Sequence, residues 1–159
     1  MWPFPMESAH PLVVHFPIAL LMTSVALELA ALALKRPGLH RIGLWNLALG
    51  TAAAGIAVLT GLRAEDVAKH SFEIAQVLEV HERLGISTFV LGLLSVSWRL
   101  ARRDRLTPRA RAVTMVLMGA MLGTLTWGAH LGGRLVYEFG VGGTFGAAAR
   151  SSPSTPSSR

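Results

Sequence analysis

The sequence predicts an all-α integral membrane protein, a four-helix bundle in which every helix crosses the bilayer. Of its 159 residues, 52% are hydrophobic and only 15% are charged, which is too apolar for a soluble domain of this length. The apolar residues are gathered into four long runs, each close to the roughly 20 residues that a helix needs to span a bilayer. Basic residues stand mainly between these runs. The lipid bilayer is therefore the first expected partner.

The four predicted spans are the runs Leu12–Leu34, Ile42–Leu62, Leu84–Leu100 and Ala112–Leu131. Pro37-Gly38 ends the first helix, because proline removes a backbone hydrogen bond and glycine favours a helix terminus. The third helix is expected to begin near Ser71, outside the membrane, and to enter it near His81. Thr107-Pro108 separates the preceding connection from the fourth helix.

The chain is expected to form one membrane domain with a tail. Residues 1–140 hold the four helices, whereas residues 141–159 are rich in Gly, Ala, Ser and Pro and are predicted to be disordered. The segment before the first run carries Glu7 and lacks a basic region, so the first helix is expected to be retained. There is no cysteine, which excludes disulfides, thiolate metal sites and covalent haem attachment.

Basic residues determine the expected orientation. They crowd the connections after the first and third helices, at Lys35, Arg36, Arg41, Arg99, Arg102, Arg103, Arg105, Arg109 and Arg111. By the positive-inside rule both connections face the cytoplasm, so both termini are expected on the outer side. The formal net charge of +6 is therefore explained by the basic residues of the cytoplasmic connections, and a nucleic-acid partner is not expected.

Small residues are expected to let helices approach one another closely. They recur in the second helix over Gly50–Gly55 and in the fourth over Gly119–Gly123, the latter a small-xxx-small pattern.

Histidines are the main candidates for chemistry. Counting about 1.5 Å per residue from the basic end of each helix, His15, His81 and His130 each lie about 27–30 Å higher, in one outer layer. His10 lies above the same layer. Imidazole is a common ligand of zinc, copper and iron, so at least two of the three are expected to share a metal or haem site, with His10 as a supporting or additional ligand. The alternative is that each imidazole only makes an interfacial hydrogen bond.

Four other ionisable residues are also singled out. Arg63, Arg83 and Arg134 lie near the histidine layer, where they could pair with haem propionates or another anion, or extend toward lipid headgroups. Glu28 lies inside an apolar run, so it must extend to the interface, stay protonated or find a partner such as Arg99.

His40 and His70 are predicted to be ordinary loop residues. Without a histidine in the cytoplasmic half of the helices, a pair of bis-histidine haems stacked across the bilayer is not expected. The sequence also lacks the motifs of a di-iron carboxylate bundle, a phosphate-binding loop and a hydrolase nucleophile.

The histidine motifs carry a family resemblance. The blocks are His10-Pro-Leu-Val-Val-His15-Phe-Pro17, His81-Glu-Arg-Leu-Gly85, His130-Leu-Gly-Gly133-Arg-Leu-Val-Tyr137 and Gly140-Val-Gly142. Over about residues 9–143 the chain resembles the bacterial four-helix membrane proteins grouped as domain of unknown function 2231 (DUF2231). The resemblance implies a multi-pass protein of the bacterial inner membrane with motif histidines at His10, His15, His81 and His130. It also implies relatives fused to electron-transfer modules such as cytochrome c domains, and it brings no particular activity.

The preferred hypothesis is a membrane-embedded redox or electron-transfer protein. It binds haem b or a transition metal on the outer side, where a cytochrome or another redox protein is a possible partner. Whether the protein is an enzyme is left open. One alternative is a non-catalytic scaffold or subunit of a larger membrane complex. Another is a small proton-linked transporter or sensor, in which Glu28 and the outer histidines form a polar path.

Overall fold

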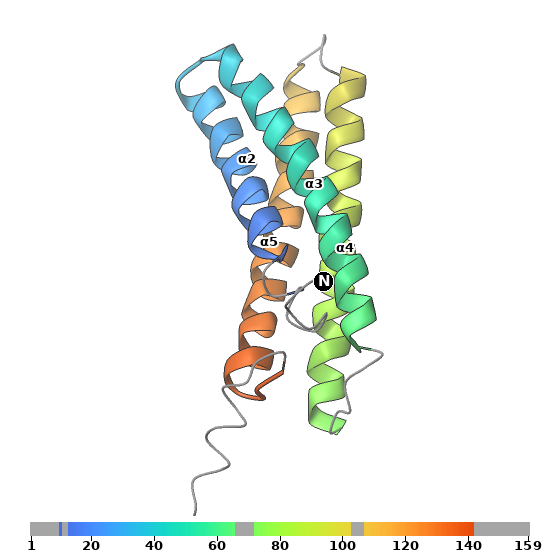
Figure 1. Ribbon diagram of the computed structural model, residues 1–159. Coiled ribbons are helices and arrows are strands. Elements are labelled where there is room, and N and C mark those ends of the chain that lie inside the picture. Colours follow the sequence, from blue (N-terminus) through green and yellow to red (C-terminus); the bar gives the residue numbers. More distant parts are fainter. Residues whose placement is uncertain (1–9, 11–12, 66–71, 103–106, 142–159) are drawn as a thin grey trace, which may run out of the picture.

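The computed structural model describes residues 10, 13–65, 72–102 and 107–141, which form four helices running up and down in a bundle (Figure 1). The helices are α2 (His15–Ala33), α3 (Pro37–Glu65), α4 (Phe72–Arg102) and α5 (Pro108–Tyr137). Each contains a window apolar enough to cross a membrane, with a mean hydropathy of 1.5 to 1.9. The predicted all-α membrane bundle is confirmed. His70 and the predicted tail beyond residue 141 lie outside the described residues.

The helix ends follow from local chemistry. Thr107 caps α5, because its side-chain oxygen accepts a hydrogen bond from the Ala110 N–H at 3.2 Å, and Pro108 occupies the first position, where no N–H is needed. At the other end of α5, Gly140 has a φ of 68°, which glycine adopts without strain. The Val141 N–H then donates to the Leu135 carbonyl at 2.9 Å. The sequence predicts the boundary at Thr107-Pro108 before α5.

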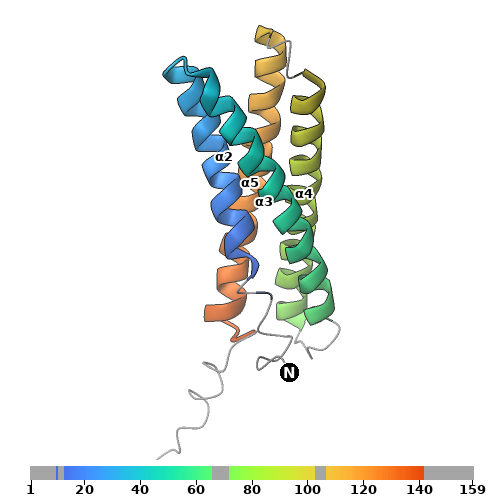
Figure 2. The ribbon, with the colours of Figure 1, turned by 45° about the horizontal axis from the view of Figure 1, so that its top comes forward.

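The bundle is built from two helical hairpins. Helix α2 packs along α3, and α4 packs along α5; α3 and α4 join the hairpins, whereas α2 and α5 touch only weakly (Figures 1 and 2). The end of α2, the start of α3, the end of α4 and the start of α5 lie together at one end, which we call the basic end. The start of α2, the end of α3, the start of α4 and the end of α5 lie at the opposite end, which we call the histidine end.

The interior is narrow and the outer surface is apolar. Among the described residues, a central cluster of buried apolar side chains contains Leu21, Leu47, Ala54, Met118 and Met121. Large apolar side chains point outward, among them Phe16, Trp45 and Val116, which are 65–70% exposed. In water such an apolar surface would favour aggregation, whereas the hydrocarbon of a bilayer solvates it. The outward-facing side chains therefore contact lipid.

Glycines allow close approach at positions that the sequence identified only in part. A Cβ on Gly50 would lie 2.8 Å from Leu21 Cδ2, and one on Gly92 would lie 2.6 Å from Thr51 Oγ1. The prediction for the second helix is confirmed. The prediction for Gly119 and Gly123 is wrong within this chain, because no described atom lies within 4 Å of a Cβ at either position. Both glycines face outward from α5, on the side away from its packing partners.

Candidate functional site

Two histidines meet at the histidine end. His10 lies one turn before α2, where its carbonyl accepts a hydrogen bond from the Val14 N–H at 3.1 Å, and His81 lies in the half of α4 nearer the histidine end. Their ring centroids are 6.3 Å apart and their planes meet at 85°. Both side chains are half-buried. Two imidazoles from different hairpins therefore share one small volume.

Hydrogen bonds fix which ring nitrogen of each histidine carries the proton. His81 Nδ1 lies 2.9 Å from the Gly128 carbonyl, which can only accept, so Nδ1 is the donor. His10 Nδ1 lies 3.2 Å from Thr60 Oγ1, whose own proton goes to the Ala57 carbonyl at 2.9 Å. The Thr60 oxygen therefore accepts from His10. In the neutral form of both rings, Nε2 keeps its lone pair, which is the arrangement found in histidines that bind metals.

Two glycines make room for these rings. A Cβ on Gly61 of α3 would lie 3.1 Å from His10 Cε1, and a Cβ on Gly132 of α5 would lie 3.0 Å from His81 Cε1. Any larger residue at these positions would press on the imidazoles. Helices α3 and α5 therefore limit where the two rings can lie.

The environment of His10 favours the neutral ring. Burial lowers the pKa of His10 below its ordinary value of 6.5, the nearby His81 lowers it further, and a hydrogen bond with the Ala57 backbone acts in the opposite direction. A metal or haem iron needs a neutral imidazole. The shift therefore keeps the Nε2 lone pair available at pH values where an exposed histidine begins to take up a proton.

This shift predicts a pH-dependent stability. Between the folded pKa of His10 and the unfolded value of 6.5, the unfolded chain binds more protons, so stability falls as the pH is lowered through that window. We expect the melting temperature in detergent to fall from about pH 7.5 to about pH 5.5, and to fall less in His10→Gln. An equal fall in both proteins would show that other groups cause it.

The other predicted ligands, His15 and His130, lie on exposed helix faces. His15 opens α2, and His130 packs beside Trp127 on α5, with ring centroids 5.6 Å apart. Among the described residues, no three His, Cys, Asp or Glu side chains gather closely enough to hold a metal ion. The structure thus brings His10 to His81, and the roles of His15 and His130 stay predictions.

The three predicted anion partners are exposed or partly exposed arginines. Arg83 pairs with Glu79, and Arg134 Nε lies 2.9 Å from Glu138 Oε2, each one turn apart on its own helix. Such pairs contribute little, so an incoming anion could displace them. Arg134 also lines an open hollow of about 300 Å³ on α5 with Ala129, His130, Gly133, Tyr137 and Glu138. Arg63 is exposed in the last turn of α3.

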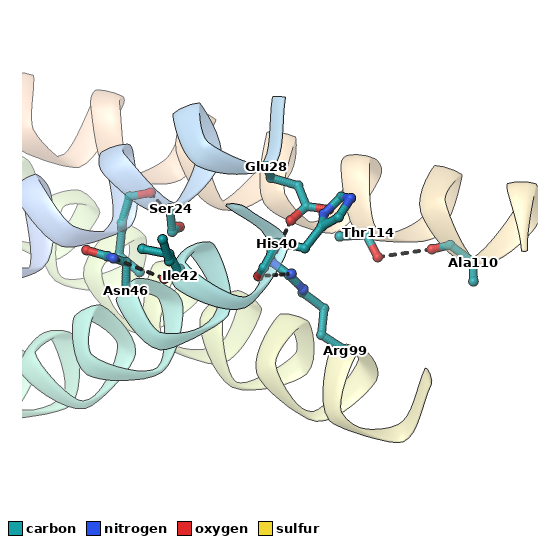
Figure 3. A network of polar contacts seen from close by, with 9 residues as sticks. Ser24, Glu28, His40, Ile42, Asn46, Arg99, Ala110 and Thr114 are labelled. Atoms are coloured by element: carbon teal, nitrogen blue, oxygen red, sulfur yellow. Dashed lines mark hydrogen bonds and ion pairs between the residues drawn. The ribbon is translucent and has the colours of Figure 1, made fainter. Parts of the chain in front are cut away.

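A buried ionic network lies at the basic end (Figure 3). Glu28 of α2 is only 3% exposed, and its Oε1 accepts a hydrogen bond from His40 Nδ1 at 2.9 Å. Its Oε2 lies 2.8 Å from Arg99 Nη1 and forms an ion pair with it. The angles at these two atoms do not satisfy the geometry of a hydrogen bond. Arg99 Nη2 donates to the His40 carbonyl at 2.7 Å. We call these three residues the Glu28 network.

The network confirms one prediction and corrects another. Of the three possibilities for Glu28, pairing with Arg99 is the one that the structure shows. The prediction that His40 is a loop residue is wrong, because α3 begins at Pro37 and His40 lies in its first turn, facing Glu28. The sequence signal was present, since an acid inside an apolar span needs partners, but it did not show which face of α3 points inward.

A family profile supplies the remaining comparison. Residues 7–144 match a family described as a predicted membrane protein, DUF2231. The chain belongs to the DUF2231 family. This confirms the resemblance carried by the histidine motifs. No curated protein and no solved structure matches this DUF2231 protein.

Both polar sites lie within the part of the chain that the DUF2231 profile covers. The matched range includes His10 and His81 at one end and the Glu28 network at the other. The family description itself states membrane residence and no chemistry. The chemistry of this DUF2231 protein has to be argued from its side chains.

Proposed function

We propose that this protein is an inner-membrane redox or electron-transfer protein that holds haem b or a transition-metal ion between His10 and His81. The observation that carries the proposal is that each ring donates its Nδ1 proton to a fixed acceptor, Thr60 Oγ1 or the Gly128 carbonyl. Such second hydrogen bonds orient metal-binding imidazoles and make them better ligands.

The spacing of the rings suits a shared metal. Two imidazoles that bind one ion through nitrogens at about 2.0–2.1 Å have ring centroids about 5–6.5 Å apart, depending on the angle at the metal. The observed separation is 6.3 Å, which lies within this range. His10 and His81 would therefore be the residues that hold a haem iron or a metal ion. A bare ion usually needs further ligands, for which His15 and His130 are the candidates.

The bound group would supply one-electron chemistry, and the chain would supply position and charge. Arg63, Arg83 and Arg134 are the candidates to pair with propionates or with an acidic surface of a partner cytochrome. The positive-inside rule places the basic end in the cytoplasm and the histidine end on the outer side. A redox partner would then approach from outside the cell membrane.

The first test is an absorption spectrum with metal analysis. The full-length protein is purified in mild detergent from cells supplied with a haem precursor, and spectra are recorded before and after reduction by dithionite. We expect a Soret band that shifts on reduction, or about one metal ion per chain. His10→Ala and His81→Ala should each lose most of the band or the metal.

His15→Ala and His130→Ala serve as matched variants, because they remove the same side chain from exposed helix faces. If either loses the cofactor as completely as His81→Ala, the ligand set includes that residue. A colourless, metal-free wild-type protein would overturn the proposal and leave a scaffold or subunit of a larger complex as the better account of the histidine end.

A further inference from the structure

The Glu28 network holds one group that exchanges protons readily. Arg99 keeps its charge at any physiological pH, and its side chain is only 9% exposed. Glu28 lies between Arg99 and His40, with one carboxylate oxygen turned to each. Imidazole is the side chain that ordinarily changes charge near neutral pH. His40 carries the side chain of this kind in the network.

The position of the exchangeable proton follows from the geometry. His40 Nδ1 lies 2.9 Å from Glu28 Oε1, and an ionised carboxylate can only accept a hydrogen bond. Nδ1 therefore keeps its proton in both charge states, and the second proton binds at Nε2. A carboxylate that holds Nδ1–H in this way orients the ring and stabilises the imidazolium when it forms.

His40 is also the member of the network closest to water. Its side chain is 16% exposed, compared with 4% for Glu28. It lies three residues after Pro37, where α3 begins at the basic end. A proton can reach this ring from the aqueous side without crossing the apolar part of the bundle.

No described side chain of α5 adds a charge to the network. The α5 residues labelled in Figure 3 are Thr114 and Ala110, and the Thr114 hydroxyl donates to the Ala110 carbonyl at 3.0 Å. From α2, α3 and α4 the charged or titratable groups that face one another are Glu28, His40 and Arg99. The exposed basic residues at this end, within the part of the chain that the structure describes, are Lys35, Arg36, Arg41, Arg102, Arg109 and Arg111.

Proton uptake at His40 would also change the polar contacts that Arg99 of α4 makes with α2 and α3. Arg99 reaches both Glu28 on α2 and the His40 carbonyl on α3. Once His40 is positive, it competes with Arg99 for the same carboxylate. The charge of one imidazole thus alters the contact between the two hairpins at the basic end.

We propose that Glu28, His40 and Arg99 form a proton-binding site at the basic end, in which a proton from the adjacent water binds reversibly at His40 Nε2. The step transfers one proton to a neutral imidazole and yields an imidazolium held by the Glu28 carboxylate. The site does not depend on a cofactor at the histidine end.

Nitrogen NMR of histidine-labelled protein in detergent micelles tests the site, with the His40 signals assigned by their loss in His40→Gln. We expect the neutral ring to be the Nδ1–H tautomer, and the Nε2 signal to move from the lone-pair to the protonated position between about pH 9 and about pH 5. In Glu28→Gln the charged acceptor is gone, so the ratio of Nδ1–H to Nε2–H tautomer should fall about tenfold.

His130, exposed on α5 and outside the network, provides the reference signal in the same spectra. An Nε2–H tautomer of neutral His40 in wild-type protein would contradict the geometry. An Nδ1–H ring whose Nε2 never takes a proton over this pH range would show a permanent structural contact, and the proposal would be wrong. Both results are read from the wild-type protein, so they do not depend on the stability of any variant.

Discussion

Replacing Glu28 with leucine should lower the free energy of unfolding by about 3–5 kcal/mol, which is the usual effect of breaking a buried ion pair. The carboxylate is buried and neutralises Arg99, whose guanidinium is also buried. Without Glu28, the Arg99 charge is left in an apolar interior, where the His40 carbonyl is its one hydrogen-bond partner among the described residues. Unfolding in mixed micelles with increasing dodecyl sulfate measures the loss.

The double variant Glu28→Leu/Arg99→Leu separates the cost of an unpaired buried Arg99 charge from the loss of the attraction between Glu28 and Arg99. Removing both charges should recover most of the stability, because no buried charge remains uncompensated. Glu79→Leu is the matched control, since Glu79 also pairs with an arginine but in an exposed position. It should change stability by less than about 1 kcal/mol. If Glu28→Leu were as mild as Glu79→Leu, the network would not be a stabilising feature.

Gly92→Ala should destabilise the protein by about 1–3 kcal/mol through overpacking. The added Cβ would lie 2.6 Å from Oγ1 and 3.1 Å from Cγ2 of Thr51. Threonine is short and branched at Cβ, so it cannot swing away as a long side chain would. Helices α3 and α4 would have to move apart where the two hairpins join. Melting temperature in detergent is a sufficient measurement.

Gly119→Ala is the matched control for this substitution. No described atom lies near a Cβ at Gly119, so alanine there should be neutral or stabilise α5 by up to about 1 kcal/mol. Thr51→Ala should rescue Gly92→Ala, because it removes the two clashing atoms. Thr51 Oγ1 has no hydrogen-bond partner among the described residues, so little is lost. Equal effects of Gly92→Ala and Gly119→Ala would contradict the packing described for α3 and α4.

The sequence was sufficient to predict the four helices and their approximate ends. Length and apolarity determine spans in a bilayer, and a breaker such as Pro108 marks a helix end through backbone chemistry alone. Glu28 could also be recognised as needing a partner, because an isolated acid inside an apolar span is unfavourable. The prediction named Arg99 as one possible partner, and the structure shows this pair.

The sequence could not show which side of each helix faces inward. In a soluble bundle the apolar stripe identifies the core, but here both the core and the lipid-facing surface are apolar. Depth predicted that His15, His81 and His130 lie in one layer, yet it could not show that His81 faces His10 while His130 lies on an exposed face. For the same reason the sequence could not show that His40 faces Glu28 or that α3 and α4 approach closely at Gly92.

Each polar site is divided between the two hairpins. His10, Glu28 and His40 belong to the first hairpin or the turn before it, whereas His81 and Arg99 belong to the second. Neither half contains a complete site. A ligand bound by both His10 and His81 would oppose separation of the halves by mass action. Two separately expressed fragments, divided between Arg63 and Phe72, should therefore be inert alone and acquire both sites only when they reassociate in the membrane.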